Sequence, residues 1–257
     1  MTRAELKYYI SLHQKKYRDK ENKFLIEGIH LIEEILKSKF YSNNLETVFV
    51  SGEFDDKDLL SKLAKNNIPF EIINNKEIEK LSETKTPQGI VGVVNKITSS
   101  KPKGSSLIVA LDMINDPGNI GTIIRTCYWF NVDELILSKG SADIFNSKVI
   151  RSSQGAVFNL SITTGIDLVD YLNKQHRNGF KVYLTTLNTS QTTTETVFTG
   201  NDKFIFVFGN ESTGISKSIL ENPDFHSIKI PPYSECESLN VGISVGIILN
   251  EFRNKSK

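Results

Sequence analysis

The stretch from Asp112 to Arg125 carries residue types that can bind an anion and act on a substrate. It reads Asp-Met-Ile-Asn-Asp-Pro-Gly-Asn-Ile-Gly-Thr-Ile-Ile-Arg, so a Gly/Pro/Asn turn follows an apolar run and leads into a helical pattern. Asp116 can cap that helix with Pro117 at its first position, and the exposed amides of such a helix start suit a phosphate. Arg125 lies about two turns further along among apolar residues, where an arginine usually has a partner or a ligand. A capped helix with a surface arginine is the alternative, and the glycines read GxxG, not the dinucleotide-binding GxGxxG.

A second stretch of this kind is Phe208-Gly-Asn-Glu-Ser-Thr-Gly-Ile-Ser216, at the end of an apolar run. Gly209 would let a ligand approach the backbone closely, and Glu211 places a carboxylate beside it. The alternative interpretation is structural, because Ser212 or Thr213 could cap a following helix. No Gly-Lys-Ser/Thr follows, so the stretch is not a Walker phosphate loop.

The third stretch runs from Ile228 to Gly246 and joins an apolar run, two prolines and a polar loop to an apolar helical pattern. Ser238 is expected to open this helix, and small residues at 242, 244 and 246 would allow close backbone packing. A capped core helix explains part of this pattern. It does not explain why polar Ser238 and Asn240 flank Leu239 at the start of the helix.

The elements that would position these stretches alternate between apolar strands and helices. Strands are expected at 107–111, 134–137, 160–163, 181–187, 203–208 and 228–230, and helices at 119–130, within 145–158, and at 166–175 and 239–252. This alternation predicts an α/β fold with a mostly parallel sheet covered by helices. Because ligands bind outside the carboxyl ends of parallel strands, the three stretches are expected to converge in one pocket.

A smaller α/β unit precedes this part, with strands expected at 24–28, 47–50, 69–73 and 89–94 and helices at 29–36, 58–65 and 76–81. Its sheet is also expected to be largely parallel. Residues 98–106 include Ser, Pro, Gly and Lys but no apolar residue, so they form the expected linker between domains at 1–97 and 107–257. Residues 1–23 hold seven Lys/Arg against three acids, a local charge of +4 that is typical of a solvated helical face.

The composition limits the class of protein. The 257 residues are 39% hydrophobic and 24% charged with a net charge of +1, so a folded chain is expected and bulk charge does not indicate a nucleic-acid partner. Cys127 and Cys236 lack zinc-binding spacing, and reduced thiols in a cytoplasmic protein without a metal are the simplest interpretation. The N-terminus lacks the apolar core of a signal peptide, and no apolar run reaches the ~18–20 residues of a membrane span.

Taken together and in this order, the three stretches resemble the motifs of the SpoU/TrmH branch of the SPOUT methyltransferases, over roughly residues 107–254. The motifs are Asn-x5-Arg at 119–125, Gly-Asn-Glu-x-x-Gly at 209–214, and Ile-Pro with Glu-Ser-Leu-Asn-Val at 230–241. Tyr-Ser-Glu-Cys at 233–236 and Gly-Ile-Ser at 242–244 depart from the more usual pattern, which affects the expected shape of the loop and not the chemistry. The first domain, with Phe-Leu-Ile-Glu-Gly at 24–28 and Thr-Pro-Gln-Gly-Ile-Val-Gly at 86–92, resembles the RNA-binding domain of many members, which is similar in fold to a ribosomal protein that binds kinked RNA.

The resemblance implies a C-terminal trefoil knot, S-adenosylmethionine bound in a bent conformation within it, and a homodimer whose active site is assembled across the interface. The family's catalytic residues fall on Asn119, Arg125, Glu211, Ser238 and Asn240. The residues expected to lie near the cofactor are Leu187, Gly209, Ile230 and Leu239.

The reaction implied by the resemblance is methyl transfer to a ribose 2′-hydroxyl, an in-line displacement in which positioning supplies much of the rate. The three motifs contain no histidine, and a neutral arginine base would be costly because arginine is effectively always protonated. We therefore expect Arg125 to hold the neighbouring phosphate and to stabilise developing alkoxide charge. Ribosomal RNA is the expected substrate and transfer RNA the alternative. A non-catalytic RNA-binding protein and a nucleotide-binding oxidoreductase are the competing classes, disfavoured by the intact motifs and by the missing GxGxxG respectively.

Overall fold

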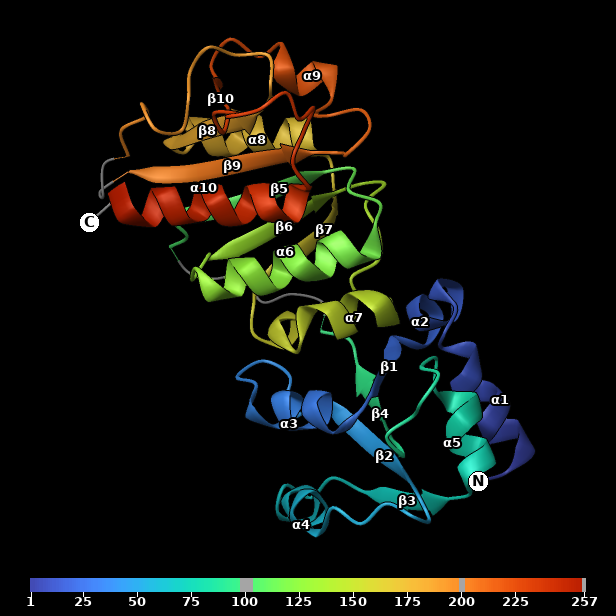
Figure 1. The fold of residues 1–257 in the computed structure, drawn as a ribbon. Helices are drawn as coiled ribbons and strands as arrows, with labels where there is room; N and C mark the ends of the chain where they lie inside the picture. The colour runs from blue at the N-terminus through green and yellow to red at the C-terminus, as the bar shows by residue number, and fades with distance from the viewer. Residues whose placement is uncertain (98–103, 199–201, 256–257) are drawn as a thin grey trace. The chain divides into compact units, whose positions relative to one another are not determined.

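The computed structural model describes residues 1–97, 104–198 and 202–255, and the chain forms two compact units (Figure 1). Unit 1 comprises Met1–Thr98 and Asp143–Asn159, and unit 2 comprises Ser99–Ala142 and Leu160–Lys257. The segment 143–159 therefore packs with unit 1, although it follows a strand of unit 2 in the sequence. Most of the expected linker, 98–103, lies outside the described residues, and a domain division at 98–106 stays a prediction. Within the described residues, no helix is long and apolar enough to cross a membrane.

Unit 2 is built on a six-stranded sheet with the order β10-β8-β9-β5-β6-β7. Its strands are β5 (Leu107–Asp112), β6 (Glu134–Ser138), β7 (Ile162–Ile166), β8 (Phe180–Thr185), β9 (Lys203–Gly209) and β10 (His226–Ile228), and its helices are α6 (Pro117–Trp129), α8 (Leu168–Arg177), α9 (Lys217–Leu220) and α10 (Val241–Lys255). Each pair of neighbouring strands runs parallel, which confirms the predicted α/β fold with a mostly parallel sheet. The buried apolar strands β5 and β9 lie at its centre, as expected for strands covered on both faces.

Side chains of the central strands alternate between two helical layers. Ile205 of β9 belongs to a core cluster with Leu172 of α8 on one face of the sheet. Its neighbours Phe204 and Phe206 pack on the other face against Phe252 of α10, with ring centroids 5.2 and 5.6 Å apart. Helix α6 lies beside α10 on that face (Figure 1). The sheet therefore gives α6 and α10 a common apolar platform.

Two helix caps considered from the sequence are not formed in unit 2. α10 begins at Val241 and not at 239, and Asn240 caps it, because Asn240 Oδ1 accepts from the backbone N–H of Gly242 at 2.9 Å. Ser238 therefore does not open this helix. The alternative in which Ser212 or Thr213 caps the next helix is also not what forms, because their backbone N–H groups donate to Asn210 Oδ1 within a turn. The helix that follows this turn, α9, begins only at Lys217.

Unit 1 contains a four-stranded sheet with the order β1-β4-β2-β3. The strands are β1 (Lys23–Glu27), β2 (Leu45–Ser51), β3 (Phe70–Ile73) and β4 (Ile90–Asn95). β4 runs antiparallel to both β1 and β2, and only β2 and β3 are parallel, so the largely parallel sheet predicted for this unit is wrong. The strand positions agree with the sequence pattern. The pattern does not specify the order of the strands, in which β4 lies between β1 and β2.

The helices of unit 1 cover its sheet and include two short N-terminal ones that the apolar pattern did not indicate. They are α1 (Arg3–Ser11), α2 (Lys15–Glu21), α3 (Ile29–Lys37), α4 (Lys57–Lys65), α5 (Asn75–Leu81) and α7 (Ser147–Ser153), with a 3-10 turn at Ala156–Phe158. Leu12, at the end of α1, and Leu81 of α5 form a core cluster with Phe49 and Val91 of the sheet. Six of the seven residues of α2 are charged, and α1 has no fully buried residue, so neither helix shows a clear apolar stripe in the sequence.

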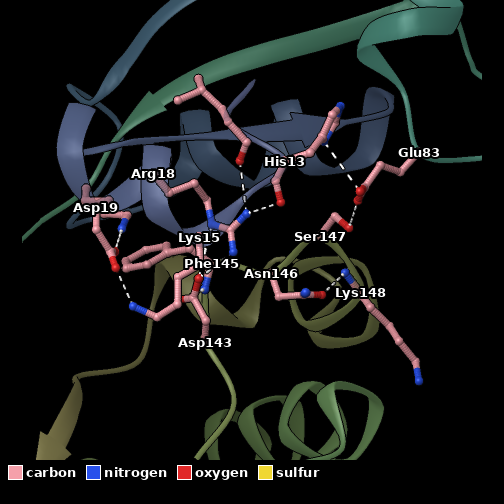
Figure 2. A network of polar contacts seen from close by, with 12 residues as sticks. His13, Lys15, Arg18, Asp19, Glu83, Asp143, Phe145, Asn146, Ser147 and Lys148 are labelled. Carbon is pink, nitrogen blue, oxygen red and sulfur yellow. Dashed lines mark hydrogen bonds and ion pairs between the residues drawn. The ribbon is translucent and has the colours of Figure 1, made fainter. Parts of the chain in front are cut away.

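Arg18 departs from the solvated basic face expected for residues 1–23, because it is only 4% exposed. Figure 2 shows its guanidinium directed at Asp143, whose Oδ2 accepts from Nε at 3.1 Å and from Nη2 at 2.6 Å. Nη1 donates to the carbonyls of Leu12 and His13 at 3.0 and 2.6 Å. Because a buried guanidinium is costly without such partners, this pair holds the start of segment 143–159 in unit 1.

Candidate active site in unit 2

The candidate site lies at the carboxyl edge of the unit 2 sheet, beside its central strands. β5 is followed on one side by β6 and β7, whereas β9, β8 and β10 lie on its other side. In parallel sheets a crevice forms at such a switch point, between the loops that leave the two neighbouring strands. The loop after β5 leads to Asn119 in the first turn of α6, and the loop after β9 carries Glu211. The topology thus brings the first two sequence motifs together.

Three side chains, one from each motif, form a single chain of hydrogen bonds. Asn119 Nδ2 donates to Glu211 Oε1 at 2.6 Å, and Asn240 Nδ2 donates to Asn119 Oδ1 at 2.9 Å. Because Asn240 Oδ1 already accepts from the backbone at the start of α10, its amide must donate to Asn119, and Asn119 must then donate to Glu211. All donors point toward the carboxylate, an arrangement in which each bond polarises the next.

Glu211 sits in a tight turn that closes on itself. A Cβ on Gly209 would lie 2.2 Å from the backbone of Gly214, so only glycine fits this close approach. The backbone of Asn210 exchanges hydrogen bonds of 3.0 and 2.8 Å with Gly214. Asn210 Nδ2 also donates to the carbonyl of Met113 at 2.8 Å. The turn that presents Glu211 is therefore fastened to the end of β5.

Asp112 and Asn210 are site residues that the sequence reasoning did not single out. Asp112 is buried at the end of β5, and its Oδ2 accepts from the backbone N–H of Ser216 at 2.7 Å. The turn at 209–216 is thus held at both ends, by Asn210 and by Asp112. The available signal was a short polar side chain at the end of each apolar strand, where it can bond to a neighbouring backbone.

Arg125 and Ser238 stand outside this chain of hydrogen bonds. Arg125 is exposed and, among the described residues, makes no hydrogen bond or ion pair. It follows Asn119 by six residues, which places its side chain about 240° further around α6. Ser238 lies exposed in the loop before α10, where its carbonyl accepts from Cys236 Sγ at 3.5 Å. Within one chain, the structure brings together Asn119, Glu211 and Asn240 and leaves Arg125 on another face of the helix.

Close packing of α6 and α10 sets the position of Asn240 relative to Asn119. A Cβ on Gly242 would lie 3.1 Å from Thr122 Cγ2, so a glycine lets the two helices approach at their first turns. At their other ends, Arg253 donates to the carbonyl of Phe130 through Nε at 2.9 Å and Nη2 at 2.7 Å. Helices α6 and α10 therefore run parallel and contact each other at both ends.

The residues expected to contact a cofactor lie in loops at the same edge of the sheet. Leu187 follows β8, Gly209 ends β9 and Ile230 follows β10, and these three strands are neighbours. Leu239 directly precedes Asn240. Leu187 and Leu239 are 58% and 49% exposed although they are apolar, so they can cover a flat apolar ligand. Within the described ranges, no group of three or more His, Cys, Asp or Glu could hold a metal ion.

The two cysteines should differ sharply in reactivity. Cys127 is buried in α6, and burial raises the pKa of its thiol, whereas Cys236 is exposed in the loop before α10. Because the thiolate is the nucleophile, the folded protein should react with one equivalent of an aromatic disulfide reagent within minutes, and with a second only after unfolding. The measurement is thiol titration with and without denaturant. A Cys236→Ser variant should lose the fast phase, and a fast phase that persists in it would contradict this assignment.

Comparisons with known proteins find matches over both parts of the chain. The chain matches the model of the SpoU rRNA Methylase family over residues 106–250 and the model of the MRM3-like substrate binding domain over residues 3–92. It is 33% identical over 249 residues to the 23S rRNA (guanosine(2553)-2′-O)-methyltransferase of Bacillus subtilis, covering 97% of this chain and 96% of that protein.

Two solved structures extend the similarity over both units. One is a protein of the TrmH family of RNA methyltransferases from Porphyromonas gingivalis, with a TM-score of 0.86, 29% identity and coverage of 100% of this chain and 99% of that one. The other is an AdoMet-bound rRNA methyltransferase from Sinorhizobium meliloti, with a TM-score of 0.84, 27% identity and coverage of 99% and 95%. Since the family model spans more than half of the chain and includes Asn119, Glu211 and Asn240, the protein belongs to the SpoU rRNA methylase family.

Proposed function

We propose that this protein is an S-adenosylmethionine-dependent methyltransferase that methylates a ribose 2′-hydroxyl of ribosomal RNA. The observation that carries the proposal is the series of hydrogen bonds from Asn240 to Asn119 to Glu211 in a member of the SpoU family. Asn240 and Asn119 are 121 positions apart in the sequence, and Asn119 and Glu211 are 92 positions apart. The Bacillus subtilis relative is named as a 23S rRNA 2′-O-methyltransferase, and the Sinorhizobium meliloti structure is of an AdoMet-bound rRNA methyltransferase. Both names support this substrate class and this cofactor.

The residues at the sheet edge fit S-adenosylmethionine. The exposed leucines Leu187 and Leu239 suit the faces of its purine, and the loop backbones near Gly209 and Ile230 can bond to the edges of the ring. When bound, the cofactor supplies an electrophilic methyl group on a positively charged sulfur. The exposed carboxylate of Glu211 suits a cationic neighbour in this crevice, and we assign it to that role and to holding Asn119.

We assign to the two asparagines the task of holding the ribose. Each side-chain amide carries two N–H groups, and the network uses one from Asn119 and one from Asn240. The second N–H of Asn119 can hold the ribose oxygen or orient Arg125, and that of Asn240 can bind substrate or the cofactor tail. Ser238, one residue before Leu239, supplies a hydroxyl for the same purpose. This preorganisation would account for much of the rate, because the oxygen must meet the methyl carbon in line with sulfur.

Arg125 has the chemical role that none of these neutral groups can fill. Its guanidinium is always charged and offers paired donors that match a phosphate. We assign it to hold the phosphate next to the target ribose and to stabilise the negative charge that develops on the oxygen as its proton leaves. Because Arg125 lies on a different face of α6 from Asn119, this role requires another molecule to complete the site.

We propose that a second copy of the chain completes the site. Arg125 shares the outer side of α6 with Trp129, which is 83% exposed, and Ile243 of the adjoining α10 is 55% exposed. Exposed aromatic and aliphatic side chains around an unpaired arginine are typical of interface cores. A homodimer through α6 and α10 would cover this face and would bring Arg125 of one copy to the Asn119 network of the other.

The remaining parts of the proposal concern the fold and the first unit. We propose that the C-terminal segment forms a trefoil knot; the packing of α10 between α6 and the loop that follows β8 supports this. Unit 1 would bind RNA, in agreement with its match to a substrate binding domain. The domains would divide at 98–106, and access to ribosomal RNA would place the protein in the cytoplasm.

The test is transfer of tritiated methyl groups to RNA by the purified protein, followed by mapping of 2′-O-methylated nucleotides. We expect label in 23S or 16S rRNA isolated from a deletion strain and none in rRNA from the parent strain. Label confined to transfer RNA would mean that the substrate is transfer RNA and not ribosomal RNA. RNA binding without any transfer, together with no binding of S-adenosylmethionine, would favour a non-catalytic RNA-binding protein.

A further inference from the structure

Lys255, in the last turn of α10, is held by three backbone carbonyls of a single loop. Its Nζ donates to the carbonyls of Thr193 and Thr194 at 2.6 Å each and to that of Thr196 at 3.2 Å. An ammonium group has three protons, and all three are used here. Ammonium is strongly hydrated, so the free-energy cost of removing its water is offset only where a complete set of acceptors replaces that water. Residues 191–196 thus form a cradle for one specific side chain.

The cradle is closed by its own side chains. Glu195 accepts from the backbone N–H of Thr192 at 3.3 Å and from its hydroxyl at 2.7 Å, and these bonds lower the pKa of Glu195. Thr196 Oγ1 donates to the carbonyl of Thr192 at 2.8 Å. Thr193 and Thr196 are buried although they are polar. The turn is therefore a defined structure that presents carbonyl groups to Lys255.

The cradle is connected on two sides to loops that we assign to the cofactor. On one side, Gln191 lies four residues after Leu187. On the other side, the N–H of Lys229 donates to the carbonyl of Gln191 at 3.0 Å, and the N–H of Thr193 donates to the carbonyl of Lys229 at 2.9 Å. Lys229 directly precedes Ile230. A shift of the cradle would therefore move the backbone at both Leu187 and Ile230.

We propose that Lys255 is a positioning residue for S-adenosylmethionine. At one end of α10, Asn240 donates to Asn119 and directly follows Leu239, and at the other end Lys255 ties the helix to the cradle. The lysine thereby sets the spacing between Leu239 and the two cofactor loops without touching the cofactor or the RNA itself. This inference rests on the proposed function, because it assigns those loops to S-adenosylmethionine.

The test compares Lys255→Met, which keeps the length of the side chain and removes its charge, with the wild-type protein. We expect the Kd for S-adenosylmethionine to rise about tenfold by calorimetry, consistent with losing hydrogen bonds from a charged group. The kcat at saturating cofactor and the KM for RNA should stay within about twofold. Lys174→Met, at an exposed position of α8, is the matched control and should bind like the wild type.

Each outcome decides the role of Lys255. An unchanged Kd in a folded Lys255→Met protein, or a lower kcat with unchanged Kd, would overturn it. If Lys255→Met does not fold, amide hydrogen exchange of the wild type decides, because S-adenosylmethionine should slow exchange at residues 191–193 and 229–230, and no change there would refute the inference. A wild-type protein that binds no S-adenosylmethionine would instead refute the proposed function.

Discussion

Replacing Arg125 with alanine is expected to lower kcat/KM for methyl transfer about 10³-fold, while the Kd for S-adenosylmethionine stays within about threefold. Loss of one preorganised donor to a developing oxyanion costs about 10²–10³ in rate, and Arg125 would also lose its bond to the phosphate. The cofactor loops should be unaffected, because Arg125 makes no hydrogen bond or ion pair to any described residue. Single-turnover methylation and calorimetry provide the two measurements. Cofactor affinity lost in parallel with activity would contradict this role.

The same variant tests whether two copies share a site. Arg125→Ala and Glu211→Gln proteins, each nearly inactive alone, would be unfolded together and refolded as a mixture. If Arg125 of one copy serves the Asn119 network of the other, a mixed dimer retains one intact site, and activity should recover to about a quarter of the wild type, the share expected when half of the dimers are mixed and each has one of two sites. Arg125→Lys is the control for charge alone and should remain impaired, because lysine lacks the paired donors. No recovery in a verified mixed dimer would place the complete site within one chain.

The second large effect is expected from Asn119→Asp, which should lower kcat/KM about 10²-fold. The change replaces the amide that donates to Glu211 over 2.6 Å with a carboxylate, so two like charges would face each other where a hydrogen bond stood. Asn240 can still donate to the new carboxylate, and the start of α10 should stay capped. Steady-state kinetics and the thermal unfolding midpoint separate the local effect from a loss of folding.

A second substitution makes this test specific to the hydrogen bond. Adding Glu211→Gln to Asn119→Asp supplies an amide opposite the new carboxylate and restores a donor–acceptor pair with the direction reversed. We expect the double variant to recover about tenfold over Asn119→Asp, a non-additivity that only directly coupled side chains produce. Additive losses would mean that the contact between Asn119 and Glu211 has no part in the reaction.

The elements of unit 2 could be predicted closely, whereas the start of α10 could not. The short apolar runs 107–111 and 204–208 are typical of buried strands, and Asp116 with Pro117 marks the start of α6 by local rules alone. For α10 the sequence offers two polar residues, Ser238 and Asn240, that are equally good caps. Asn240 takes the position because its amide also reaches Asn119, 121 residues away. No local pattern contains that contact.

Arrangements between distant segments account for the other differences. β4 enters unit 1 between β1 and β2 and makes that sheet mostly antiparallel, although each strand is recognisable by itself. In the sequence, Arg18 resembles the solvated cations around it. In the structure it is buried and donates to Asp143, which lies 125 positions further along the chain. Lys255 likewise lies in a polar helix end with no distinctive sequence pattern. Only in the folded protein does it donate hydrogen bonds to three carbonyls of the loop at 193–196.

The sequence by itself determined the family resemblance, the strands and helices of unit 2, and the residues that could do chemistry, because side-chain type and short-range spacing encode all of these. The tertiary structure alone decided which of those residues meet. It joins Asn119, Glu211 and Asn240 into one directed chain of hydrogen bonds and turns Arg125 to a different face of α6. The physical reason is that a hydrogen bond depends on the distance and direction between two atoms, and both are set by how strands order and helices pack.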